Sequence, residues 1–546
     1  MMKKTFILGL ISLFISTMVI AQTEATDTIT RNVLVESVYN PILATSEKRS
    51  FLPEERTPIE HKENIVYAES AYHGIAYDIM PVRLDGVQFN KNDIRNGYLH
   101  LGYGNYNNVD ALASYVFKVK DNGRLALGGS VEGWNGSIPY DKINWHSNLH
   151  DMNLKLAYDH SGANSFRIGA HLRRFTFNYI LQDTLPSFNY ESQKAISYGG
   201  FVHFDGSSTN KAGKTPFDFS VDVSMDQWLN NYWIGTPDRN IESHITADVS
   251  GKFHLGRKGY LAIGVNNDYL GYGRLNGYNN YYAMNVCPQW LGEGKLWSAA
   301  LGLNIDTQTA EQNHFQFSPA CHFIFKPFSA MQIGLTADGG RALRSFEDLY
   351  TLSPYWASEC QLNQSYTRLN AKVQGDIRLA EGLHLSGWGA FRSVTDALFA
   401  TGETMNGLLV SKFTNANANI ILLGGNLSYT WKDIFQVSFD IEHSNWTVDD
   451  ISLLAFAPEL TLNASAKARI FKGFSADAGI CYTRRVAVES TRISPITDLH
   501  MGADYAINSW LNAFIRCNNI LNYHYSLYPA YPTQGIHGML GISCKF

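Results

Sequence analysis

The last eleven residues of the chain constrain its fold more than any other stretch; they read IHGMLGISCKF and end at Phe546. Leu540, Ile542 and Cys544 fall on one face, and small or charged residues fall between them. Alternation with a period of two describes a β-strand. Chain ends usually fray, so a strand that continues to the terminal Phe546 predicts a sheet whose last strand pairs with its first and leaves no edge.

The same alternation recurs from residue 96 to the end of the chain. Between Phe217 and Asp226, apolar residues at odd positions alternate with Asp or Ser at even positions. Alternation alone also suits a soluble β-sandwich. However, these runs exceed the roughly five or six residues usual for a globular strand and match the ~9–11 residues that cross a bilayer. The apolar faces are rich in Ala, Gly and aromatic residues, which also favours a membrane barrel.

Composition supports a barrel wall and excludes some partners. Charged residues make up 17% of the chain, against about 25% in soluble domains, and there are 30 Tyr and 45 Gly. Such a composition suits strands that face lipid on one side and water on the other. No basic run indicates nucleic-acid binding. The six cysteines form no CxxC pair, so we predict neither a metal site nor a disulfide framework.

The N-terminal region divides into a signal peptide and an extension. Lys3 and Lys4 precede an apolar segment from Phe6 to Ile20, which predicts a signal peptide, residues 1–21, cleaved near Ala21. An anchoring helix is disfavoured because the segment is shorter than the ~20 residues that span a bilayer. Residues 22–95 are polar and contain several prolines; we expect a periplasmic or lumenal extension. Residues 96–546 are assigned to the barrel.

The stretch before the last strand carries a family resemblance. Asn518–Asn522 (NNILN) follows a strand-like run, and Tyr528–Gly535 (YPAYPTQG) leads into the final strand. This order resembles the C-terminal end of TonB-dependent receptor barrels. Counting the alternating runs gives about 22 strands, an even number near that of such a barrel. The resemblance covers only the end of the chain, and it implies a barrel in the outer membrane of a Gram-negative bacterium, with solute uptake as its activity. Residues 22–95 are shorter than the plug of that family and lack its Gly-rich motifs, which puts coupling to TonB in doubt.

The predicted fold class is therefore all-β: a closed antiparallel transmembrane barrel of about 22 strands with a short N-terminal extension. Short turns are expected at one end of the barrel and long loops at the other, as in outer-membrane barrels. The sequence predicts tight turns at 121–123, 161–164, 380–382 and 431–433. It predicts long loops at 135–149, 181–191, 341–364, 397–408 and 446–457.

No enzyme constellation is present. The sequence has no GxSxG, no HExxH and no phosphate-binding loop, so we predict no catalytic residue, no cofactor and no metal. The candidate lumen charges are Arg167, Arg173, Asp218, Asp222, Asp226 and Lys252. Their mixed signs favour pairs that brace a solvated or partly filled interior over a strongly ion-selective pore. The aromatic stretches 278–282 and 350–356 are interpreted as interfacial girdle, with sugar binding as the alternative.

Two functions remain open at this stage. The first is a conduit or receptor for solute uptake. The second is an assembly or interaction protein, whose N-terminal extension and loops bind a periplasmic or surface-exposed partner. Either function needs outer-membrane lipid around the wall and the barrel-assembly machinery to insert it.

Overall fold

The computed structural model describes residues 96–546, apart from 121, 141–142, 163, 182–192, 209–216, 231–239, 256–258, 274, 276, 310–313, 358–360, 406, 433, 489–492 and 530. The expected signal peptide (1–21) and extension (22–95) lie outside the described residues. No helix in the described ranges is long and apolar enough to cross a bilayer.

The described chain is a succession of long strands with three short helical segments. The first half holds β1 (Gly97–Gly104), β2 (Val109–Val119), β3 (Gly123–Tyr140), β4 (Ile143–His160), β5 (Asn164–Phe177), β6 (Ile180–Leu181), β7 (Gln193–Ser208), β8 (Phe217–Asn230), β9 (Asn240–His254), β10 (Gly259–Gly273), β11 (Tyr281–Glu293) and β12 (Trp297–Gln308). The second half holds β13 (Phe315–Phe328), β14 (Met331–Ala342), β15 (Trp356–Ala357), β16 (Ser365–Ala380), β17 (Leu383–Met405), β18 (Leu408–Trp431), β19 (Phe435–Val448), β20 (Pro458–Phe471), β21 (Phe474–Arg485), β22 (Ile496–Ala506), β23 (Leu511–Asn518), β24 (Ser526–Tyr528), β25 (Tyr531–Pro532) and β26 (His537–Lys545). The helical segments are η1 (Asn105–Asn107), α2 (Phe346–Leu352) and η2 (Ile451–Phe456).

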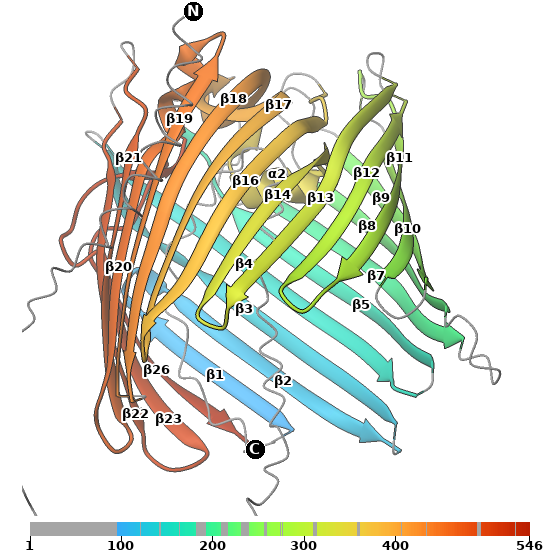
Figure 1. Cartoon of the computed structure of the whole chain (residues 1–546). Helices are drawn as coiled ribbons and strands as arrows, with labels where there is room; N and C mark the ends of the chain where they lie inside the picture. The colour runs from blue at the N-terminus through green and yellow to red at the C-terminus, as the bar shows by residue number, and fades with distance from the viewer. Residues whose placement is uncertain are drawn as a thin grey trace, which may run out of the picture. The chain divides into compact units, whose positions relative to one another are not determined.

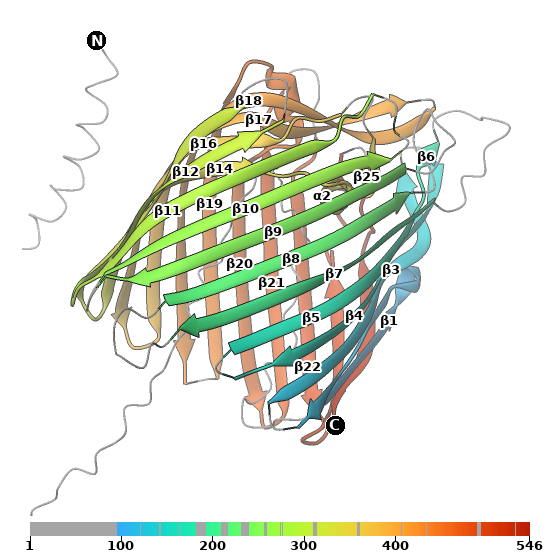
Figure 2. The same cartoon turned by 90° about the vertical axis from the view of Figure 1, so that its right-hand side faces the viewer.

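Twenty-two of the described strands form one closed antiparallel barrel (Figures 1 and 2). Each pairs with its neighbour along the chain, and β26 pairs with β1 to close the ring. Leu540 lies opposite Tyr103, and the backbones of Phe546 and Gly97 exchange two hydrogen bonds. The predicted closed barrel of about 22 strands is therefore confirmed. The shorter β6, β15, β24 and β25 lie in connections at one end of the barrel.

The two ends of the barrel differ as expected, with two corrections. β1 begins and β26 ends at the end of the barrel that carries short turns, such as those after β2, β16 and β20. The other end, which we call the mouth, carries the long connections. The predicted loops 135–149 and 397–408 are wrong, because β3 and β4 continue almost to each other, and so do β17 and β18. These residues extend hairpins beyond the wall, where strand pairing satisfies their backbone groups without a loop.

The outer face of the wall is apolar and exposed. Leu540, Ile542 and Phe546 of the closing segment are 65%, 44% and 59% exposed. On β18 the exposed series runs through Ile421, Leu423, Leu427, Tyr429 and Trp431. Residues between them point to the lumen, as the pleat requires. An exposed apolar face on a closed sheet is stable only against hydrocarbon, so this belt is the surface that lipid covers.

An apolar cluster of buried side chains lies at the mouth, and we call it the mouth cap. Its members are Ile138, Trp145, Phe175, Phe177, Tyr179, Ile180, Ala195, Trp228, Phe346, Leu349, Tyr350, Tyr355, Trp356, Ala357, Leu398, Ala400, Leu408, Leu409, Val410, Phe413 and Tyr531. The tip of the β17–β18 hairpin pairs with β6, which follows β5. In the ring of 22, β18 and β5 are eleven strands apart in either direction. The hairpin therefore crosses the whole mouth, as Figure 2 shows.

We expect a charge to destabilise the barrel strongly at one residue of β18 and only weakly at the next. Leu427→Arg places a guanidinium in the middle of the lipid-facing series, which costs about 2–4 kcal/mol at the bilayer midplane. Ser428→Arg places the same group in the lumen and should cost much less. Denaturant unfolding in lipid vesicles, followed by tryptophan fluorescence, measures both. Equal losses for the two variants would contradict the assignment of the two faces.

Candidate functional site

The short helix α2 belongs to the mouth cap and contacts the inner face of the wall. It begins at a capping box: Asp348 N–H donates to Ser345 Oγ, and Ser345 N–H donates to Asp348 Oδ2 at 2.9 Å. This reciprocal pair satisfies two backbone donors at the helix start. Phe346, Leu349 and Tyr350 are buried in the cap. Glu347 and Asp348 remain on the side that faces the wall strands.

One arginine fastens α2 to the wall. Arg173 of β5 donates to Asp151 of β4 at 2.6 Å and to Glu347 of α2 at 2.9 Å. The Ser197 hydroxyl of β7 donates to the second Glu347 oxygen at 2.6 Å. The Arg173 guanidinium also lies 4.2 Å from the centre of the Phe175 ring. A planar guanidinium with two carboxylate partners and an aromatic neighbour holds the helix in one position and neutralises part of the carboxylate charge.

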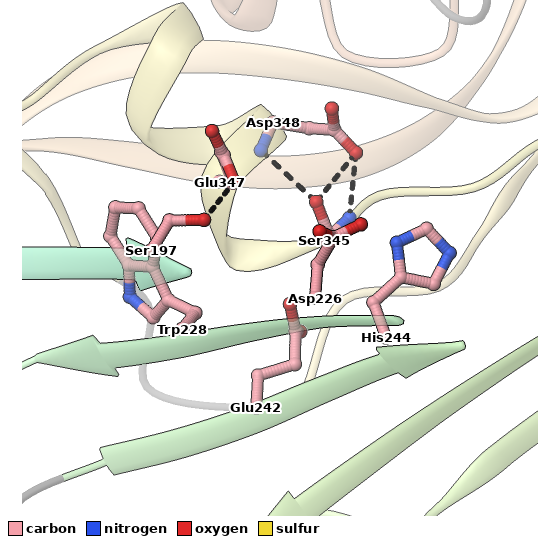
Figure 3. Close-up of a pocket in the computed structure, with 8 residues that line it drawn as sticks. All are labelled: Ser197, Asp226, Trp228, Glu242, His244, Ser345, Glu347 and Asp348. Atoms are coloured by element: carbon pink, nitrogen blue, oxygen red, sulfur yellow. Dashed lines mark hydrogen bonds between the residues drawn. The ribbon is translucent and has the colours of Figure 1, made fainter. Parts of the chain in front are cut away.

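A recess opens beneath α2, between the helix and the wall (Figure 3). Its cavity measures about 190 Å³. It is lined by Ser197, Asp226, Trp228, Glu242, His244, Ser345, Glu347 and Asp348. These residues come from β7, β8, β9 and the start of α2. Four of the eight are carboxylates, so the recess is strongly acidic.

Glu242 is the least exposed of these carboxylates. It is 1% exposed, and its Oε1 accepts the backbone N–H of Phe346 at 2.7 Å. Its Oε2 forms no hydrogen bond of good geometry with a described residue, although the Tyr272 hydroxyl interacts with the same carboxyl group. A buried carboxylate oxygen without a donor is costly when ionised. The recess therefore contains an acceptor that a donor from outside the described chain would satisfy.

The lumen charges predicted from the sequence lie on the inner wall, and the structure separates them. Of these six residues only Asp226 lines the recess, and Arg173 reaches it through its ion pair with Glu347. The other contacts are Arg167 with Asp159, Asp218 with His254 at 3.1 Å, Asp222 with His203 at 2.5 Å, and Lys252 4.3 Å from the centre of the Tyr260 ring. Asp226 itself lies 3.3 Å from His171.

The signs of these charges are not evenly mixed around the barrel. Among described residues, the lumen face of β7–β10 carries seven carboxylates and one lysine: Asp205, Asp218, Asp222, Asp226, Glu242, Asp248, Asp268 and Lys252. Asp222 lies directly opposite Asp248 across β8 and β9. Like charges in that position are destabilising. The lumen charges have mixed signs around the barrel, and in this sector carboxylates are in excess.

The aromatic residues of 350–356 do not form an interfacial girdle. Tyr350, Tyr355 and Trp356 are buried in the mouth cap, and Tyr355 stacks on Tyr531 at 3.6 Å between ring centres. Burial raises the pKa of the Tyr355 phenol well above its ordinary value, because ionisation there would leave a charge without water. Burial also raises the pKa of Tyr528 to about 12. Both hydroxyls therefore stay neutral across the physiological range.

The described ranges contain no cluster of metal-ligating side chains and no disulfide. No group of three or more His, Cys, Asp and Glu side chains there lies close enough to hold a metal ion. The five described cysteines are free thiols: Cys287, Cys321, Cys481, Cys517 and Cys544. Sequence reasoning missed Glu242, Glu347 and Asp348. The capping pattern Ser345–Phe346–Glu347–Asp348 was a readable signal for α2, but nothing local indicated that it meets β9.

Comparison with known proteins gives matches in structure and none in sequence. No protein-family model matches the chain, and no curated protein matches it. The FrpB iron transporter from Neisseria meningitidis (F3-3 variant) is similar with a TM-score of 0.64 and 12% identity, over 83% of this chain and 82% of that one. A mutant ferric enterobactin receptor, PfeA, from Pseudomonas aeruginosa gives 0.62 and 11%, over 83% and 80%. The copper transporter OprC gives 0.61 and 11%, over 84% and 81%.

These likenesses, at such identities, establish the fold alone. The chain has the 22-stranded outer-membrane barrel of TonB-dependent receptors. The resemblance inferred from the C-terminal strand and its preceding loop is thereby confirmed at the level of the barrel.

The contacts of Tyr531 predict how the mouth cap can be loosened. Its hydroxyl donates to the Leu409 carbonyl and accepts from the Ile180 N–H at 3.2 Å, so it bonds both partners of the β6–β18 pair. Tyr531→Phe leaves a buried carbonyl without its donor, which costs about 1–3 kcal/mol. We expect faster cleavage at the hairpin tip in limited proteolysis. Tyr523→Phe, at a 54% exposed position, is the control and should be cleaved as slowly as the wild type.

Proposed function

We propose that the chain takes up solutes through its barrel, and that its mouth is closed by its own loops until a solute or a partner displaces them. The observation that carries this proposal is the contrast between the two parts of the interior. The three buried apolar clusters of the described residues gather near the mouth. Below them the inner wall carries Asp, His, Lys and Arg side chains, which suit water and solutes.

The similar structures support uptake as the class of function. Their names describe an iron transporter, a receptor for ferric enterobactin and a copper transporter. We carry over only movement of a solute across the outer membrane. Residues 22–95 lack the Gly-rich plug motifs of TonB-dependent receptors, so our proposal does not include TonB.

The mouth cap favours one second candidate, an interaction protein. Tyr355, Tyr531 and Trp145 pack ring against ring, and the hairpin tip adds strand pairing across the mouth. A cap held this firmly also suits a barrel that displays loops to a partner and never opens. Removing the cap separates the two candidates.

Replacing residues 345–357 by a short Gly/Ser linker removes α2, the Arg173–Glu347 ion pair and the Tyr355–Tyr531 stack. If the barrel is a conduit, we expect conductance in planar bilayers to rise at least tenfold above the wild type. The control is the same linker in place of 451–456, which packs against the separate cluster around Phe456 and Ile420; it should leave conductance unchanged. A correctly folded variant without 345–357 that stays electrically silent would favour the interaction protein.

A further inference from the structure

We propose that the recess beneath α2 binds a compact organic cation, of the primary-ammonium class. The proposal deepens the proposed function by naming a substrate class. It rests on that function only in treating the ligand as a solute of this barrel. Its basis is the arrangement of Glu242, Asp226, Glu347 and Asp348 around one small cavity.

The first step is the unused acceptor. Glu242 is 99% buried, and one of its two oxygens forms no hydrogen bond of good geometry with a described residue while the other holds the first residue of α2. Asp226 lines the recess beside it, and its Oδ1 lies 3.3 Å from His171 Nε2, so it adds an acidic group but no second unused acceptor. An ammonium group carries three donors and a positive charge, which is the complement of the unused Glu242 oxygen.

The second step is the charge balance. Arg173 is shared between Asp151 and Glu347. His171 lies 3.3 Å from Asp226, and His244 lies 3.6 Å from Asp268. Arg341 lies 3.7 Å from Asp268, and buried Arg344 acts on Asp348. These two arginines and Arg173 are fewer than the six carboxylic groups around them: Asp151, Asp226, Glu242, Asp268, Glu347 and Asp348. A cationic ligand reduces the repulsion that this excess creates.

The third step is the choice among cations. No described group of His, Cys, Asp and Glu side chains has the closeness that a metal ion needs. The cavity of about 190 Å³ is smaller than the ~300–1,000 Å³ sites of drug-sized ligands. The Trp228 indole provides an aromatic wall, and aromatic faces attract organic ammonium groups. The recess therefore fits a small amine, or the amine end of a larger solute.

The fourth step is the path away from the recess. Asp226, Asp222 and Asp218 follow one another at every fourth residue along the lumen face of β8. Asp248 of β9 lies opposite Asp222. These carboxylates extend from the recess toward the end with short turns. A row of one sign on a wall concentrates ions of the other sign.

The test is direct binding, measured by isothermal titration calorimetry on the full-length protein in detergent micelles. Ethanolamine, which is protonated at neutral pH, is the probe, and ethylene glycol is the neutral probe of matched size. We expect the wild type to bind ethanolamine and not ethylene glycol. Glu242→Gln keeps an oxygen for the Phe346 N–H but cannot ionise when a cation binds, and it should weaken ethanolamine binding at least tenfold.

Two further variants and one further probe complete the design. Asp226→Asn should also weaken binding, whereas Asp376→Asn, on β16 and outside the recess, should not. Native gel mobility identifies the folded variants. Absence of ethanolamine binding to the wild type, undiminished binding to folded Glu242→Gln and Asp226→Asn, or a stronger response to Mg²⁺ overturns the proposal. Calorimetry does not depend on conductance, so the two proposals can fail separately. If the wild type binds ethanolamine while the variant without 345–357 conducts no ions, the conduit is refuted and the binding site is retained.

Discussion

The rest of the structure depends on the hydrogen bonds between β1 and β26. Within a bilayer there is no water to satisfy a backbone group, so a sheet with free edges cannot cross it. The pairing from Tyr98–Lys545 to Gly104–Met539 removes both edges at once. Once the ring is closed, each strand must present one face to lipid and one to the lumen. The lumen charges, the recess and the mouth cap all take their positions from that division.

The sequence predicts what repeats along the strands. The alternation that ends at Phe546 predicted the closing strand, and the runs upstream predicted a ring of about 22. Turn residues such as Glu381–Gly382 marked the short connections, and Gly382 has the positive φ of 77° that its turn requires. These features are local, because a period of two and a turn type are written in adjacent residues.

The sequence does not predict what meets across the barrel. Residues 397–408 look like a loop because their alternation is weak. Both faces of this hairpin are covered, and Leu398, Phe399 and Ala400 are all buried. In the same way, nothing near Glu242 indicates Phe346, since more than a hundred residues separate them. The recess is visible only when the ring places β9 beneath α2, so the carboxylates that matter most were missed while the regular series on β8 was found.

The β17–β18 hairpin also acts as a cross-brace. It leaves one wall and is bonded to the opposite one through β6 and Tyr531, so it ties two ends of a single diameter. A ring tied in this way resists becoming oval along the tie. Lateral pressure from the surrounding bilayer therefore acts on the brace as well as on the strands, and the thickness and stiffness of the lipid set part of the load that its few hydrogen bonds carry.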